Sequence, residues 1–166
     1  MQEIQLTNLP ERAQSWKKAN KQFLKRLKSR KDLSVVMQKT HQEVFSEVDC
    51  LNCANCCKTT GPLFTDRDIE RIARHFKMSF QEFVGQYLRR DEDDDLVLKE
   101  LPCPFLEFDH KCQIYDIRPK ACRQYPHTDA NNQNRIFSLT LKNAEICPAV
   151  WEILERINTN LQNLKV

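Results

Sequence analysis

The chain has 166 residues, of which 40% are hydrophobic and 30% are charged, so it fits one domain with a modest core and an appended element. With only Gly61 and Gly85, it has no P-loop and no Rossmann glycine pattern, which excludes nucleotide chemistry on those scaffolds. The net charge of +3 by itself indicates neither nucleic acid nor a membrane surface.

Residues 1–48 are predicted to be a basic amphipathic helical segment with a break at residues 29–32. Residues 1–31 carry nine Lys or Arg against two acidic residues, and they lack the apolar stretch of a secretory signal. We expect the apolar stripes to pack and the lysine face to stay in solvent. That face has no interleaved aromatic residues for base stacking, which argues against nucleic acid and leaves a protein partner open. The stripes recur at helical spacing: Trp16, Ala19, Phe23 and Leu27, then Val36, Met37, Thr40, Val44 and Val48.

Residues 50–62 are predicted to be a cysteine-rich loop and carry the strongest signal. Thiolates three residues apart in a tight turn converge, and two successive C-x2-C steps are typical of the iron–sulfur ligand run of ferredoxins. The adjacent pair at its end diverges in most conformations, so either one thiol only packs or the pair serves two metal centres. The four cysteines are Cys50, Cys53, Cys56 and Cys57.

The middle of the chain reads as a helical hairpin followed by loop. A capping pattern at Thr65 begins one helix and a capping box at Ser79 begins the next. The acidic run 91–95 lacks the spacing of a calcium loop, so a solvated loop is expected. Short strands are predicted at Leu96–Lys99 and Ile136–Leu141, and a last helix starts at Pro148. The predicted fold class is mainly α, with an irregular, metal-organised centre and a few short strands.

A second group of cysteines supplies the remaining candidate ligands. Structural zinc usually takes two compact knuckles, whereas iron–sulfur sites accept distant ligands, so the spacing favours an iron–sulfur cluster over zinc. Nearby Arg118 and Arg123 either offset thiolate charge or pair with Asp109 or Asp116. The second group is Cys103, Cys112, Cys122 and Cys147, with Cys50, Cys53 and Cys56 as first choices in the loop and Cys57 and Cys147 as second choices.

Eight cysteines without a secretory signal indicate a cytoplasmic setting, where metal or redox chemistry is favoured over structural disulfides. No apolar stretch reaches the roughly 20 residues of a membrane span, so no membrane partner is expected. Domain boundaries are expected at residues 1–48 for the basic segment and 49–166 for a cysteine-cluster metal-binding domain.

The cysteine pattern resembles a known family. The Cys50–Cys57 run, the sequence Cys103-Pro-Phe-Leu and the stretch from Cys112 through Arg118-Pro119 to Cys122-Arg123 are similar to the YkgJ-type CxxCxxCC cysteine-cluster family. The resemblance covers about residues 48–128 and extends towards Cys147. It implies a zinc- or iron-chelating domain, and some larger relatives resemble flagellin lysine methyltransferases. This chain has no room for a methyltransferase domain, so that activity does not transfer.

Three functions fit these observations. The favoured one is an accessory or binding module in which the metal stabilises the fold and a surface meets a protein partner. The second is an iron–sulfur enzyme, an oxidoreductase or protein-modifying enzyme, with Tyr115, Arg118 and Arg123 lining the site. The third is a protein that carries zinc or iron and releases it. The sequence contains no substrate signature, leaves the oligomeric state undetermined and does not decide whether the protein is an enzyme.

Overall fold

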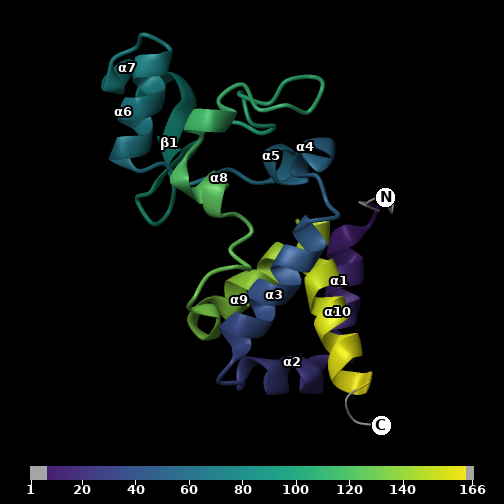
Figure 1. Cartoon of the computed structure of the whole chain (residues 1–166). Helices are drawn as coiled ribbons and strands as arrows, with labels where there is room; N and C mark the ends of the chain where they lie inside the picture. The colour runs from purple at the N-terminus through teal and green to yellow at the C-terminus, as the bar shows by residue number, and fades with distance from the viewer. Residues whose placement is uncertain (1–6, 164–166) are drawn as a thin grey trace. The chain divides into compact units, whose positions relative to one another are not determined.

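The computed structural model describes residues 7–163 and confirms the predicted mainly α fold (Figure 1). By its contacts the chain divides into two compact units. The helical unit consists of Met1–Asp49 together with Pro126–Val166, and the cysteine unit is Cys50–Tyr125. This division differs from the predicted single domain over residues 49–166. The structure instead groups residues 126–163 with the N-terminal helices. Among the described helices, none combines the length and apolar character needed to cross a bilayer.

The helical unit is built by the two ends of the chain. Helix α3 lies against both α9 and α10, and the shared core takes seven buried residues from the N-terminal part and seven from the C-terminal part (Figure 1). Its elements are α1 (Leu9–Ala19), α2 (Lys21–Lys28), α3 (Leu33–Phe45), α9 (Gln133–Asn143) and α10 (Pro148–Asn163).

The predicted apolar stripes form part of this core. Leu27 and Met37 are fully buried, and Trp16 is half-buried with its ring edge-to-face to Phe23. The predicted break at residues 29–32 is confirmed, and a further break at Asn20 separates α1 from α2. The lysine face is not wholly solvated, because the Lys17 ammonium forms an ion pair with Glu145.

One predicted strand is wrong. Residues 136–141 lie within helix α9, which buries Gln133, Phe137 and Thr140 on one face. The segment alternates apolar and polar side chains, and this local pattern favours a strand. Burial at positions i, i+4 and i+7 against the helical core overrides it, since that spacing forms a single face only in a helix.

The cysteine unit has its own hydrophobic cluster around a helical hairpin. Both predicted caps are confirmed: Thr65 and Asp68 form a reciprocal capping box on α6, and Ser79 and Glu82 form one on α7. The predicted strand at Leu96 is confirmed as β2, paired antiparallel with β1 so that Leu88 faces Leu98. The elements are α4 (Cys50–Cys53), α5 (Asn55–Thr59), α6 (Asp66–His75), α7 (Phe80–Tyr87), β1 (Leu88–Arg90), β2 (Leu96–Leu98), the 3₁₀ turn η1 (Tyr115–Ile117) and α8 (Lys120–Gln124).

Candidate metal centre

The first four cysteines lie on two short helices rather than in the predicted loop. Cys50 and Cys53 begin and end α4, and positions three apart share one face of a helix. Between the two helices, Ala54 is buried and takes a left-handed conformation with φ 48°. A non-glycine residue in that region costs about 1–2 kcal/mol, so the tight junction between the two cysteine-bearing turns is held by its surroundings.

The adjacent pair Cys56 and Cys57 shares helix α5, and the two Sγ atoms are 4.0 Å apart. The hydrogen bond from Cys56 lowers the pKa of Cys57 to about 7, and the charge of Lys58 acts in the same direction against burial. A lowered pKa makes the Cys57 thiolate, the form that binds a metal, more accessible near neutral pH.

Three downstream cysteines belong to the same compact unit as Cys57, and one of them contacts it directly. The Cys103 backbone N–H donates a hydrogen bond to the Cys57 carbonyl oxygen at 2.8 Å. Cys112 sits in an isolated bridge opposite Leu106, and Cys122 lies in the middle of α8.

Charge on Cys57 contributes to the pKa of each of the three downstream thiols. Burial raises the pKa of Cys103 to about 11 and that of Cys122 to about 12, and charge on Cys57 and Cys112 raises both further. Burial also raises the pKa of Cys112, again with a contribution from Cys57. Charge on Cys57 thus acts on all three downstream thiols, and a bound cation would offset the repulsion between the thiolates.

The remaining candidate ligands are placed differently. Cys50 is exposed and Cys53 is partly exposed. Cys147 belongs to the helical unit and packs against its hydrophobic cluster. Across residues 7–163, no three His, Cys, Asp or Glu side chains are already arranged as a chelating site. The described thiols are therefore not preorganised around an ion, and rotation of their side chains would be needed to enclose one.

The candidate arginines lie beside the second cysteine group. The Arg118 guanidinium is stacked over the Tyr115 ring at 3.8 Å and donates to the Tyr115 carbonyl oxygen at 2.7 Å. Arg123 donates to the Arg118 carbonyl oxygen at 2.7 Å. Among the ion pairs of the described residues, Asp109 pairs with Lys111 and neither arginine pairs with Asp109 or Asp116. The positive charge of Arg118 lowers the pKa of Cys112 and Cys122, opposing the effect of burial.

Two side-chain contacts in this unit have no signature in the sequence. The Lys58 ammonium lies 2.9 Å from Nε2 of His110, which links the cysteine pair on α5 to the loop before Cys112. The Asp68 carboxylate reaches the start of α8 as well as its own capping box. These contacts join residues 52 positions apart in each case, so no local pattern predicts them.

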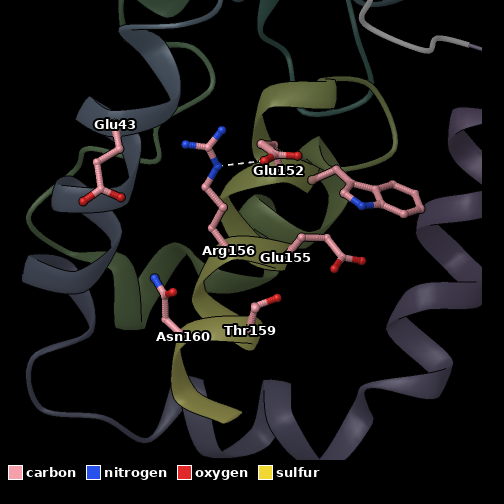
Figure 2. A pocket seen from close by; sticks show the side chains of 7 residues that line it. Glu43, Glu152, Glu155, Arg156, Thr159 and Asn160 are labelled. Carbon is pink, nitrogen blue, oxygen red and sulfur yellow. Dashed lines mark hydrogen bonds and ion pairs between the residues drawn. The ribbon is translucent and has the colours of Figure 1, made fainter. Parts of the chain in front are cut away.

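The helical unit has a separate surface pocket of about 580 Å³ (Figure 2). Arg156 crosses it to pair with Glu152 at 2.7 Å and also pairs with Glu47 at 2.8 Å. The lining is Glu43 of α3 with Trp151, Glu152, Glu155, Arg156, Thr159 and Asn160 of α10. It offers carboxylates and no thiol, so it lacks the soft ligands that suit thiolate-bound iron or zinc.

Comparison with known proteins identifies the family of the chain. Residues 49–148 match the family CxxCxxCC, described as "Putative zinc- or iron-chelating domain". The chain belongs to this family. An uncharacterized protein of Methanocaldococcus jannaschii is 35% identical to this CxxCxxCC protein over 82 residues, which cover 48% of this chain and 44% of the relative. The chain thus spans less than half the length of that curated relative. No solved structure matches.

Proposed function

We propose that this CxxCxxCC protein holds an iron–sulfur cluster through its cysteine unit and acts as an accessory module. The observation that carries the proposal is the 2.8 Å backbone hydrogen bond that joins Cys103 to Cys57, in a unit where Cys112 and Cys122 also respond to the charge of Cys57. Iron–sulfur clusters are held by four cysteine thiolates and accept such dispersed ligands. The unit also offers Cys50, Cys53 and Cys56, more thiols than one zinc ion uses.

Zinc is the second candidate, and one distance favours it. Two thiolates on a tetrahedral zinc ion with bonds of about 2.3 Å lie about 3.8 Å apart. The Sγ atoms of Cys56 and Cys57 are 4.0 Å apart, close to this value. Thiolates bound to different irons of a cluster are more widely separated, so this pair would bind a shared ion or contribute only one ligand.

The proposed accessory role rests on the folded unit that surrounds the thiols. The donor set is built into a folded unit with its own hydrophobic cluster, so a bound metal would add its binding free energy to the stability of that unit. We place the protein in the cytoplasm, because reduced thiols persist there and the seven cysteines of the cysteine unit would remain available for metal. A protein partner, rather than nucleic acid or membrane, is the expected contact of the accessory surface.

Anaerobic purification with analysis of iron, zinc and acid-labile sulfide tests the metal proposal. We expect iron and sulfide in the wild-type protein and their loss in Cys57→Ser. Cys147→Ser is the matched control, because this thiol packs in the helical unit. Stoichiometric zinc without sulfide would replace the cluster by the zinc candidate. Absence of both metals from freshly purified protein, and failure to take up either, would overturn the metal-binding function.

A further inference from the structure

The Asp68 carboxylate caps its own helix and also binds the start of α8. The carboxylate is only 1% exposed. Its Oδ2 atom accepts hydrogen bonds from the Thr65 hydroxyl at 2.7 Å and the Thr65 backbone N–H at 3.2 Å, which completes the capping box of α6. Its Oδ1 atom accepts from the Lys120 backbone N–H at 3.1 Å and from Arg71 at 2.6 Å. One buried carboxylate therefore joins the start of α6 to the start of α8.

Arg71 extends this connection. Its Nε and Nη2 atoms donate to the Ile117 carbonyl oxygen at 3.2 and 3.1 Å, and Nη2 also donates to the Arg118 carbonyl oxygen at 3.0 Å. Together, Asp68 and Arg71 bind three backbone groups of residues 117–120. The planar guanidinium suits this role, since its donors are fixed in one geometry.

Besides these bonds from α6, the bound segment is held by Arg123, which donates to the Arg118 carbonyl oxygen, and by Ile117, which packs against the hydrophobic cluster of the unit. Arg118 and Pro119 are both extended, with ψ 154° and 151°, and Pro119 has no backbone N–H to donate. The helix that follows, α8, has only five residues, and a helix of this length is not stable by itself. Cys122 is the third residue of α8, so the location of its Sγ depends on where the side chains of α6 hold residues 117–120.

We propose that Asp68 and Arg71 are positioning residues for Cys122, an inference that rests on the proposed metal-binding function. They hold the start of α8 against α6, within the same unit (Figure 1). This places the Cys122 thiol within electrostatic reach of Cys57, Cys103 and Cys112 before a metal arrives. The pair thereby reduces the ordering that metal binding would otherwise require of this ligand.

The test variant is Arg71→Met, with Arg71→Lys as a milder variant that keeps the charge beside Asp68. Arg74→Met is the matched control, because Arg74 lies in the same helix and is exposed. Ser79→Ala is the stability control, because it weakens the cap of α7 without touching residues 117–122. Circular dichroism at the assay temperature verifies that each variant is folded.

Two measurements report on Cys122: cobalt binding by the loaded protein and alkylation of the thiol in the metal-free protein. In protein loaded with cobalt(II), thiolate-to-cobalt absorption should fall in Arg71→Met, and loss of cobalt to a chelator should be about tenfold faster. In the metal-free protein, site-resolved alkylation by iodoacetamide should be about tenfold faster at Cys122 and unchanged at Cys53, because a released α8 further exposes its partly buried thiol. Arg71→Lys should change cobalt binding and Cys122 alkylation in the same direction as Arg71→Met, but by less. Arg74→Met should change neither measurement.

The outcomes separate the two proposals. If wild-type protein binds neither cobalt, zinc nor iron, the proposed function fails, and the alkylation ratio alone decides the role of Arg71. If Arg71→Met behaves like Arg74→Met in the alkylation assay, the positioning role is overturned. It is also overturned if Ser79→Ala accelerates Cys122 alkylation as much as Arg71→Met, since a general loss of stability would then explain the effect.

Discussion

Removal of residues 1–48 should unfold α9 and α10, because the helical unit has one core shared by both ends of the chain. The fragment 49–166 would keep five large buried side chains without their partners: Phe137, Val150, Ile153, Leu154 and Ile157. Exposing a buried side chain of this size costs about 1.5–3 kcal/mol. Five of them together cost about 8–15 kcal/mol, which is comparable with the whole stability of a typical domain, about 5–15 kcal/mol.

Hydrogen–deuterium exchange with peptide-level resolution tests this prediction. In the full chain, peptides from 133–163 should be protected, and in the fragment 49–166 they should exchange as unfolded chain. Peptides from α6 and α7 are the internal reference, because their cluster takes its buried residues from 64–114 alone. Adding residues 1–48 as a separate peptide should restore protection of α10. Undiminished protection of 133–163 in the fragment would refute the shared core and would support residues 49–166 as an independent domain.

Further predictions concern single side chains. Leu27→Ala should lower the free energy of unfolding by about 2–5 kcal/mol in urea titrations, since Leu27 is fully buried, while exposed Lys28→Ala should change it by less than about 0.5 kcal/mol. Cys122→Ser should lower metal content and melting temperature together, because a lost ligand is lost folding energy, and an unchanged metal content would remove Cys122 from the ligand set. Burial would raise the pKa of Asp68, but hydrogen bonds from Thr65, Arg71 and Lys120 outweigh it and leave the pKa lowered. Its contribution to stability is therefore present above the unfolded-state pKa of about 4 and lost as the pH falls through the folded-state value. In metal-free protein, Asp68→Asn should lower the free energy of unfolding most at neutral pH, and this free energy should approach the wild-type value in acid. A difference between the two proteins that does not depend on pH would contradict this prediction.

Local sequence determined the features whose interactions are local. The capping boxes at Thr65 and Ser79 join residues three positions apart, so their side chains are sufficient to predict where α6 and α7 begin. Pro148 likewise begins the last helix as expected. The close spacing of the first four cysteines indicated a metal-binding family before any fold was known, because chelation by C-x2-C depends on only a few residues.

Tertiary structure decided the features that depend on distant segments. Residues 136–141 have a strand-like pattern but become helix, since Phe137 is buried in a core formed with residues about 100 positions away. Sequence spacing ranked Cys56 ahead of Cys57, whereas folding brings Cys57 near the downstream thiols and places Cys147 in the helical unit. The contacts of Asp68 and Arg71 with residues 117–120 also arise only on folding. Such pairings follow from chain topology, which propensity and spacing along the sequence do not encode.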